Sequence, residues 1–476
     1  MGSKLLRMKI KKICCIGAGY VGGPTMAVIA YKCPNITVNV VDINKNKIDK
    51  WNSNDLDNLP VYEPGLSEIV EKVRDKNLFF SCDIEKEISN AEMIFLAVNT
   101  PTKKYGEGKG MAIDLKYVED SARLIAKFSN EPKIVVEKST LPVRTAEAIE
   151  KILKSENPSV KFEVISNPEF LAEGTAIKDL FKSDRVLIGG HKTRQGVEAV
   201  TALVEIYSNW IQREKIITTN LWSSELSKLV SNAFLAQRIS SINSISALCE
   251  STGADIDEVS RAVGKDKRIG PEFLKASVGF GGSCFQKDIL SLVYLCKYYN
   301  LNEVADFWKS VIDINNYQRD RFSKKIIQSL FGSVSDKKIC ILGWSFKKNT
   351  NDSRESSAIV VSSNLIENGA EIRVYDPKVK KERILADINE YLLNLNIKKD
   401  LINDYLSRIK IFENPNEASK KASAICILTE WDEFTVIDWE LIYSGMKRPA
   451  WIFDGRNILN REILKNMGFE IYQIGK

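Results

Sequence analysis

A glycine-rich turn near the start of the chain limits the fold more than any other feature. Residues 11–16 form an apolar run that predicts a strand. Residues 17–22 follow it, with glycine at their first, third and sixth positions, and open a helical stretch. Residues 37–41 predict a second strand, which ends at Asp42. This order of elements predicts a parallel sheet that helices cover on both faces.

The same turn predicts a dinucleotide site. Glycines let the backbone approach a pyrophosphate, which then lies at the N-terminus of the following helix. Asp42 ends the next strand, where a carboxylate accepts hydrogen bonds from a ribose 2′-hydroxyl. Because a carboxylate repels a 2′-phosphate, the pattern favours NAD over NADP. A tight turn that binds no ligand is the alternative.

Strand-like and helical segments alternate up to about residue 220. Further strands are expected at residues 93–98, 134–136, 162–166 and 185–188. From residue 221 apolar residues recur at helical spacing, which predicts one long helix that ends near Gly253. Shorter helices are expected at residues 255–263, 283–299 and 303–322.

The pattern then restarts, because residues 337–343 repeat the order of residues 11–17 and lead to a strand that ends at Asp376. Further strands are expected at residues 424–428, 451–454 and 469–474. Bulkier residues stand where the later glycines would be, so we expect this second unit to bind an anion other than a dinucleotide. We therefore predict an α/β protein with two Rossmann-like, doubly wound parallel-sheet domains, joined by a central helical domain with one long helix. The expected boundaries are residues 1–220, 221–330 and 331–476.

Composition excludes several classes of function. The formal charge of +6 comes from scattered basic residues, which suits a small anionic ligand better than a nucleic acid. No apolar run is long enough to cross a membrane, and the basic N-terminus has no signal-peptide core, so we expect a cytoplasmic enzyme. His191 is the only histidine and no Cys-x-x-Cys pair occurs, so we expect no metal site.

Cys284 is the strongest candidate nucleophile. It follows a glycine loop at residues 279–282 and precedes Lys287 and Asp288 on a helical segment. Ser283 and Gln286 have the spacing of a capping box, which would make Cys284 the first helical residue. The positive end of a helix dipole stabilises a thiolate. A buried structural cysteine behind a glycine turn is the alternative.

Four other segments carry polar residues that can serve a site. Residues 99–102 and 137–142 follow strands, at the sheet edge where open parallel sheets bind ligands. Residues 167–174 predict a short helical turn with Glu169 and Glu173 on one face. Lys228 and Asn232 lie four residues apart on the long helix. Ordinary turns and solvated helix faces remain the alternatives.

Together these segments resemble the nucleotide-sugar dehydrogenases of the UDP-glucose/GDP-mannose dehydrogenase family. The matching residues are 17–22, 99–102, 137–144, 167–179, 224–241, 268–288, 343–357 and 453–456. The resemblance implies an NAD-binding domain, a helical domain that forms a dimer, and a UDP-binding domain. It also implies two successive oxidations of a UDP-sugar alcohol, UDP-glucose at C6 being favoured, through a thiohemiacetal and a thioester.

The resemblance assigns roles to individual residues. The implied catalytic residues are Cys284, Lys228, Asp288, Asn232, Glu169 and Thr140. The implied cofactor-binding residues are Gly17, Gly19, Tyr20, Val21, Gly22, Asp42, Lys47, Thr100, Pro101, Thr102, Ser139, Thr140, Glu173 and Arg354. The implied substrate-binding residues are Glu169, Phe170, Leu171, Glu173, Lys228, Asn232, Arg268, Phe273, Lys275, Phe280, Gly281, Cys284, Phe346, Lys347 and Arg456, with Arg268 coming from the second subunit of a homo-oligomer, either a dimer or a trimer of dimers.

Three alternatives remain open at this point. Another nucleotide sugar, such as a UDP-N-acetylhexosamine or GDP-mannose, can undergo the same chemistry. A one-step NAD-dependent hydroxyacid dehydrogenase also combines a Rossmann domain with a long helix, but it needs neither the thiol nor the third domain. A non-catalytic nucleotide-binding protein would not need Cys284, Lys228 and Asp288 together. The general base cannot be chosen among Asp288, Lys228 and Glu169 from the sequence.

Overall fold

The computed structural model describes residues 9–476 and divides them into two compact units. The first contains residues 9–231 and 290–299, and the second contains residues 232–289 and 300–476. Two helices run from one unit into the other: α9 (Leu221–Thr252) and α11 (Phe285–Tyr298). The expected division into three domains stays a prediction.

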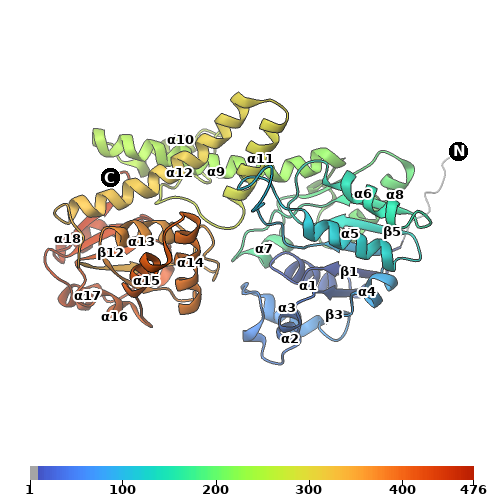
Figure 1. Cartoon of the computed structure of the whole chain (residues 1–476), viewed down its shortest axis with the longest axis horizontal. Helices are drawn as coiled ribbons and strands as arrows, with labels where there is room; N and C mark the ends of the chain where they lie inside the picture. Colours follow the sequence, from blue (N-terminus) through green and yellow to red (C-terminus); the bar gives the residue numbers. More distant parts are fainter. Residues whose placement is uncertain (1–8) are drawn as a thin grey trace. The chain divides into compact units, whose positions relative to one another are not determined.

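The first unit is built on an eight-stranded sheet in the order β3-β2-β1-β4-β5-β6-β7-β8 (Figure 1). Its strands are β1 (Lys12–Ile16), β2 (Thr37–Val41), β3 (Leu78–Ser81), β4 (Met93–Leu96), β5 (Lys133–Glu137), β6 (Phe162–Ser166), β7 (Val186–Gly190) and β8 (Ile216–Asn220). Strands β1 to β6 are parallel, whereas β7 pairs with β6 in the antiparallel sense and β8 follows β7. The parallel sheet that the sequence predicts is therefore confirmed for six of its strands.

Helices cover both faces of this sheet, as the unbroken apolar runs of its strands require. Its helices are α1 (Gly22–Lys32), α2 (Lys45–Trp51), α3 (Leu66–Val73), α4 (Ile84–Asn90), α5 (Lys116–Phe128), α6 (Thr145–Glu156), α7 (Ala176–Phe181) and α8 (Arg194–Tyr207). Ile13 and Cys15 point into a core with α1, α3 and α8, while Cys14 and Ile16 point into a core with α4, α5 and α6. Because successive side chains of a strand point to opposite faces of the sheet, each strand contributes side chains to both cores.

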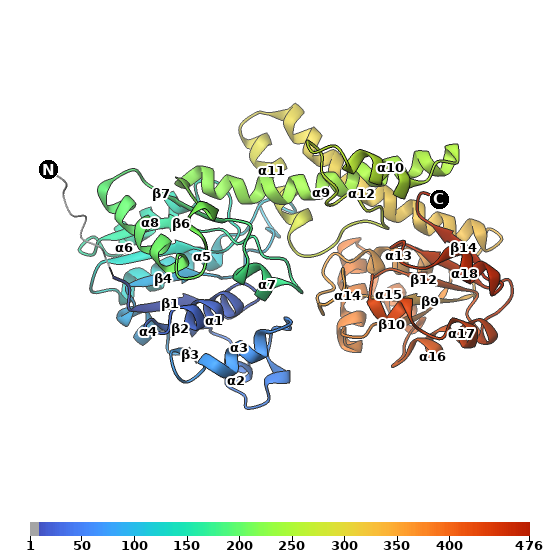
Figure 2. The same cartoon turned by 180° about the vertical axis from the view of Figure 1, so that it is seen from behind.

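The second unit contains a six-stranded, fully parallel sheet in the order β11-β10-β9-β12-β13-β14. Its strands are β9 (Lys338–Leu342), β10 (Glu371–Tyr375), β11 (Ile409–Ile411), β12 (Ala424–Ile427), β13 (Trp451–Asp454) and β14 (Glu470–Gln473). Its helices are α10 (Ile256–Gly264), α12 (Asn302–Ser329), α13 (Ser357–Glu367), α14 (Lys381–Asn394), α15 (Lys399–Ser407), α16 (Pro415–Ser419), α17 (Trp439–Gly445) and α18 (Arg461–Asn466). Figure 2 shows this sheet between α13 on one side and α16 and α17 on the other.

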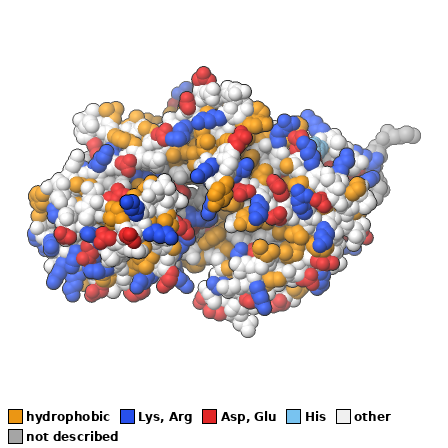
Figure 3. Space-filling view, in the orientation of Figure 1, with side chains coloured by type: hydrophobic (Ala, Val, Ile, Leu, Met, Phe, Trp, Pro, Cys, Tyr) orange, Lys and Arg blue, Asp and Glu red, His pale blue; other side chains and the backbone are white. Residues whose placement is uncertain are grey.

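The long helix and the second Rossmann-like unit are confirmed. Helix α9 has 32 residues, and α10, α11 and α12 start within two residues of the expected positions. None of the helices within residues 9–476 combines the length and the apolar composition that a bilayer crossing requires. On the face drawn in Figure 3, basic and acidic side chains are interspersed, in agreement with the scattered charge of the sequence.

Two local expectations are wrong. Residues 167–174 contain no helix, because Asn167 is drawn into the core, where its Nδ2 donates to the Leu187 carbonyl at 2.8 Å. Helix α11 begins at Phe285, one residue late, and the Cys284 carbonyl accepts the first helical hydrogen bond from the Asp288 N–H. The side-chain amide of Gln286 donates to Glu355 at 2.9 Å, and the capping box stays a prediction.

Candidate active site

The glycine turn after β1 has the geometry of a pyrophosphate cradle. Gly17 has a φ of +111°, which favours glycine, and a Cβ on Gly22 would lie 2.0 Å from the Gly17 carbonyl oxygen. A Cβ on Gly19 would meet nothing within 4 Å, so the turn leaves open space where a phosphate must approach. Tyr20 and Val21 precede the N-terminus of α1 and are half-buried. These residues fit the dinucleotide that the sequence predicts.

Asp42 follows β2 and holds the turn from the neighbouring strand. One of its oxygens accepts the Ala18 N–H at 3.0 Å and the Lys47 ammonium at 2.8 Å, and the other accepts the Asn44 N–H at 2.9 Å. Partial burial would raise the pKa of Asp42, but Lys47 and the two N–H groups lower it below its ordinary value. The carboxylate is therefore charged at neutral pH and lies against the glycine turn, where it could accept a hydrogen bond from a ribose hydroxyl of NAD.

The loops after β4 and β5 lie at the same edge of the sheet. Thr100 is buried, Pro101 is exposed, and Thr102 pairs with Ile113. Ser139 is fixed by a 2.7 Å hydrogen bond from its hydroxyl to the Val98 carbonyl. Thr140, the next residue, is half-buried. The structure thus brings both expected loops beside the glycine turn in the first unit.

Glu169, after β6, is the centre of a buried polar cluster. Its Oε1 accepts the N–H groups of Phe170 and Leu171 at 2.8 and 3.0 Å, and its Oε2 lies 2.8 Å from the Lys138 ammonium. Burial alone would raise the pKa of Glu169, but the charge of Lys138, its hydrogen bond and the charge of Lys228 lower it. Glu169 is therefore ionised at neutral pH, and both of its oxygens have defined partners.

Two cationic side chains lie near the ring of Phe170. The Arg185 guanidinium lies 4.0 Å from the centre of its ring and the Lys228 ammonium lies 5.3 Å away. Lys228 is buried on α9, in the part of that helix that belongs to the first unit. Glu173 is half-buried and does not share a helix face with Glu169, because the segment is not helical.

Two buried carboxyl groups, those of Glu137 and Glu225, lie near the loop that carries Thr140. Glu225 of α9 accepts the N–H groups of Arg144 and Ala146 at 2.7 and 2.9 Å and so caps α6. Glu137, at the end of β5, is 1% exposed. Burial and the neighbouring charge of Glu225 raise the pKa of Glu137 well above its ordinary value.

In the second unit, helix α12 holds the glycine loop that precedes Cys284. Asn315 accepts the Phe280 N–H at 2.9 Å and donates to the Phe280 carbonyl at 3.0 Å. Arg319 donates to the carbonyls of Phe280 and Glu355 at 2.6 and 2.7 Å. A Cβ on Gly281 would lie 2.5 Å from the Glu355 carbonyl oxygen, which explains the glycine there. The backbone at Phe280 is therefore fixed from below by two buried side chains.

Cys284 is exposed at the end of this loop. Its Sγ lies 3.5 Å from the Ser283 hydroxyl. One turn further along α11, Asp288 is fully buried, and Asn232 donates to its Oδ2 at 2.6 Å. The Lys287 ammonium lies 3.9 Å from the other Asp288 oxygen. The second unit thus presents an accessible thiol beside a buried, hydrogen-bonded carboxylate.

The remaining expected substrate residues divide into two groups. Arg268, Phe273 and Lys275 are exposed; the Arg268 side chain is 89% exposed and pairs with Asp266 at 2.6 Å. In the second group, Arg456 donates to the carbonyls of Leu428 and Phe346 at 2.8 and 3.0 Å.

Lys347, which belongs to the second group, and Arg354, which the resemblance assigns to the cofactor, lie on the loop between β9 and α13. The Lys347 ammonium lies 5.6 Å from the centre of the Phe346 ring. Arg354 pairs with Asp352 at 2.5 Å, and its carbonyl accepts the Gly282 N–H at 2.8 Å, so its backbone supports the cysteine loop.

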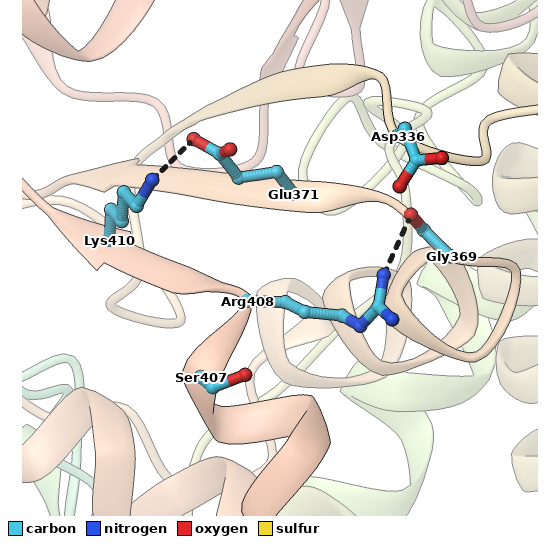
Figure 4. Close-up of a pocket in the computed structure, with 6 residues that line it drawn as sticks. All are labelled: Asp336, Gly369, Glu371, Ser407, Arg408 and Lys410. Carbon is cyan, nitrogen blue, oxygen red and sulfur yellow. Dashed lines mark hydrogen bonds and ion pairs between the residues drawn. The ribbon is translucent and has the colours of Figure 1, made fainter.

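One surface pocket of the second unit lies away from these residues. It has a volume of about 210 Å³, and Figure 4 shows its lining: Asp336, Gly369, Glu371, Ser407, Arg408 and Lys410. These residues lie at the start of β9, β10 and β11, whereas ligands of open parallel sheets bind at the carboxyl ends of the strands. Two of its charged groups are already paired, Lys410 with Glu371 at 3.3 Å. We do not assign it to the reaction.

The sequence interpretation missed Lys138, Asn315 and Arg319. Lys138 and Arg319 are charged side chains that are 3% and 2% exposed, and their partners lie 29 or more residues away in the chain. A lysine directly after an apolar strand was the one available signal for Lys138. Within residues 9–476 no cluster of three or more His, Cys, Asp or Glu side chains could hold a metal ion.

Comparison with known proteins agrees with this geometry. Three models of the UDP-glucose/GDP-mannose dehydrogenase family match the chain: the NAD binding domain over residues 11–211, the central domain over residues 222–317, and the UDP binding domain over residues 340–461. The UDP-glucose 6-dehydrogenase of Caenorhabditis elegans is 58% identical over 470 residues, which cover 98% of this chain and 95% of that protein. The enzyme of Bos taurus is 58% identical over 472 residues, covering 98% and 94%.

A solved structure shows the same architecture. The UDP-glucose dehydrogenase of Pyrobaculum islandicum superimposes with a TM-score of 0.80 at 28% identity, over 97% of this chain and 98% of that one. The glycine turn, the buried carboxylates and the exposed cysteine thus occur in a chain that matches all three domains of one family. The chain belongs to the UDP-glucose/GDP-mannose dehydrogenase family.

Proposed function

We propose that this chain oxidises UDP-glucose to UDP-glucuronate in two NAD-dependent steps at C6. Relatives at 56–58% identity over nearly the whole chain are UDP-glucose 6-dehydrogenases, and this supports UDP-glucose over other nucleotide sugars. The observation that carries the proposal is the exposed thiol of Cys284. This residue directly precedes α11, and its carbonyl accepts the N–H of Asp288 in that helix. A one-step oxidation of an alcohol has no use for such a thiol.

The thiol holds the intermediate between the two oxidations. The C6 alcohol first loses a proton and a hydride and becomes an aldehyde. The Cys284 sulfur then adds to C6 and forms a thiohemiacetal, whose oxidation gives a thioester. Water attacks the thioester, the C–S bond breaks, and the free thiol and the carboxylate product are released. Bound NAD supplies the chemistry of accepting each hydride, so two NAD are reduced per substrate.

Neighbouring side chains manage charge and protons in these steps. We assign Lys228, a buried lysine, to stabilise the oxyanions at C6, and Asn232 to orient the same centre. Asp288 takes protons from the alcohol or the water, because its carboxylate lies one turn after Cys284. Thr140 and Glu169 position the water.

The substrate and cofactor residues remain as the resemblance assigns them. Gly17, Gly19 and Gly22 would hold the pyrophosphate of NAD, and Asp42 would hold its ribose. The diphosphate of the UDP-sugar would lie against arginine and lysine side chains, among them Arg268 and Lys347. Each of these contacts is a proposal that site-directed variants can test.

We also propose a homo-oligomer, with a second copy of this chain on α9 and α12 of the second unit. Phe234 and Leu248 of α9 are 55% and 59% exposed, and Phe307 of α12 is 55% exposed. Phe234 and Phe307 both contact Trp308, so the exposed rings form one apolar surface. Such surfaces mark interfaces between proteins. Arg268, which is exposed and paired only locally in its own chain, would reach the site of the second copy.

The test is an assay against a panel of nucleotide sugars. The proposal predicts that UDP-glucose has the highest kcat/KM, ahead of UDP-N-acetylhexosamines and GDP-mannose, and that the product is UDP-glucuronate. In Cys284→Ser the acid should not form, whereas Cys82→Ser, the change at another exposed cysteine, should leave acid formation unchanged. Acid yield at the wild-type level in Cys284→Ser would overturn the covalent route. We propose a cytoplasmic location, where UDP-sugars and NAD are both available.

A further inference from the structure

Lys138 is a buried charge that the proposed mechanism does not use. It directly follows β5 and is 3% exposed. A lysine is almost never fully buried unless its charge has a partner. Its Nζ lies 2.8 Å from Oε2 of Glu169 and donates to Asn167 Oδ1 at 3.1 Å and to the Tyr207 hydroxyl at 3.3 Å. The ammonium group therefore has three polar partners, one for each of its N–H groups.

The other members of this network are also buried and hydrogen-bonded. The Tyr207 hydroxyl donates to Asn167 Oδ1 at 2.8 Å, and Asn167 donates in turn to the Leu187 carbonyl at 2.8 Å. Asn167 and Tyr207 are 1% and 3% exposed. The Lys138 ammonium thus has partners on three sides, and one of them is Oε2 of Glu169, with which it forms an ion pair at 2.8 Å. The other oxygen of Glu169 is fixed by the backbone of Phe170 and Leu171.

We propose that Lys138 is a positioning residue for the reaction, which holds the Glu169 carboxylate charged and in one orientation. The inference rests on the proposed role of Glu169. Three titratable groups lie near that carboxylate: Lys138 after β5, Tyr207 of α8 and Lys228 of α9. Lys138 has the largest effect of the three on the pKa of Glu169, which burial alone would raise. Without Lys138, Glu169 binds a proton more readily and loses its fixed Oε2 partner.

The chain offers a matched control on the same strand. Lys133, at the other end of β5, is also 3% exposed, but its ammonium donates to the carbonyls of Ser89 and Ala91 rather than to a carboxylate of the site. Lys133→Met therefore removes a buried lysine from β5 without touching Glu169. Any effect common to both lysine variants comes from the loss of a buried lysine, and not from Glu169.

The experiment measures kcat and kcat/KM from pH 5.5 to 9.5 for Lys138→Met, Lys133→Met, Glu169→Gln and the double variant Lys138→Met/Glu169→Gln. In Lys138→Met we expect kcat at pH 6.5 to fall roughly ten-fold. This loss is smaller than the loss expected on removing a general acid or base itself, which is about 100-fold or more. The loss should shrink as the pH rises, because the acid limb of the profile moves to higher pH. Lys133→Met should leave the acid limb in place.

The double variant separates positioning from a merely structural role. If Lys138 acts through Glu169, removing it in the Glu169→Gln background changes kcat by less than about two-fold, because the two changes are not additive. The double variant also contains no uncompensated carboxylate at this position, so it avoids the main expected cause of instability in Lys138→Met.

Three outcomes overturn the inference in different ways. A loss in Lys138→Met that is equal at every pH, or additive with Glu169→Gln, shows a structural role only. Wild-type kinetics in Lys138→Met with an impaired Glu169→Gln overturn the role of Lys138 alone. Wild-type kinetics in Glu169→Gln overturn the proposed role of Glu169, and the role of Lys138 with it.

Discussion

Asn232 donates a 2.6 Å hydrogen bond from its Nδ2 to Oδ2 of Asp288, which joins α9 to α11 one turn beyond Cys284. Asn232 is 5% exposed and Asp288 is 0% exposed. A buried carboxylate needs such donors, because leaving it without them costs several kcal/mol. The bond therefore fixes the carboxylate that we assign to proton transfer.

Asn232→Ala should lower kcat more than it raises KM, because it removes a donor from the reacting centre and not from the UDP-binding residues. It should also cost about 1.5–3 kcal/mol of stability, the value of a hydrogen bond to a charged group. Steady-state kinetics and thermal unfolding measure the two effects. The control is Asn243→Ala, which removes a buried asparagine of α9 that accepts the Ser277 N–H at 2.9 Å. An equal loss of kcat in both variants would contradict a specific role for Asn232.

Complementation between subunits tests whether Arg268 acts across a dimer. Arg268→Ala and Cys284→Ser should each be nearly inactive alone. In a mixed dimer, one site combines Cys284 of the first variant with Arg268 of the second, so activity should return after the two are unfolded and refolded together. The expected recovery is about a quarter of wild type, from random mixing of the two chains. No recovery despite confirmed mixed dimers would show that Arg268 serves its own subunit.

Asp42→Ser should reduce the preference for NAD. The change removes the carboxylate that we assign to the ribose of NAD. It also removes the ion-pair partner of Lys47, whose ammonium lies 2.8 Å from Asp42 Oδ2. Losing a charged hydrogen bond of about 1.5–3 kcal/mol corresponds to a roughly ten- to hundred-fold lower kcat/KM with NAD. With NADP the value should rise, because Lys47 can then meet the 2′-phosphate. An unchanged ratio of kcat/KM between NAD and NADP would contradict this placement of the ribose.

Glu137→Gln should stabilise the protein at neutral and alkaline pH. The pKa of Glu137 is raised in the folded state, so the native protein holds a proton that the unfolded chain releases above about pH 4.3. The wild type therefore loses stability as the pH rises from that value to the folded-state pKa, whereas the glutamine variant does not. The gain should be small at pH 4.5 and reach about 1–3 kcal/mol at pH 8.

Thermal unfolding across this pH range measures the effect. The matched control is Glu147→Gln on the surface of α6, where Arg144 and Lys151 lower the pKa of the carboxyl group. That variant should show no gain at pH 8. A Glu137→Gln protein that is less stable than the wild type at pH 8 would contradict the raised pKa of Glu137.

The central strands could be predicted from the sequence, and most edge strands could not. The strands at Phe162–Ser166 and Trp451–Asp454 have the expected bounds, because buried parallel strands are continuous apolar runs. The missed strands β3, β8 and β11 all lie at an edge of a sheet. An edge strand is paired on one side only and tolerates polar residues such as Thr218 and Lys410, so its pattern is weaker.

The site residues likewise divide into those that local sequence predicts and those that it does not. Cys284, Asp42 and the glycine turn carry local signals, since their neighbours in sequence determine their geometry. The failed helical turn at residues 167–174 depends on contacts with Tyr207 and Leu187, which are 40 and 20 residues from Asn167. Lys138 and Arg319 are likewise defined by partners that only the folded sheet brings near. Local pattern therefore finds the reacting groups, and tertiary contacts decide what holds them.

The most direct test of the whole account is the number of NADH formed per molecule of UDP-glucose. With limiting UDP-glucose, excess NAD and the reaction run to completion, absorbance gives the NADH formed and chromatography gives the UDP-glucuronate. A cysteine that holds the aldehyde between two oxidations predicts two NADH for each UDP-glucose consumed, with no free aldehyde. One NADH per UDP-glucose, with the aldehyde as product, would contradict the account.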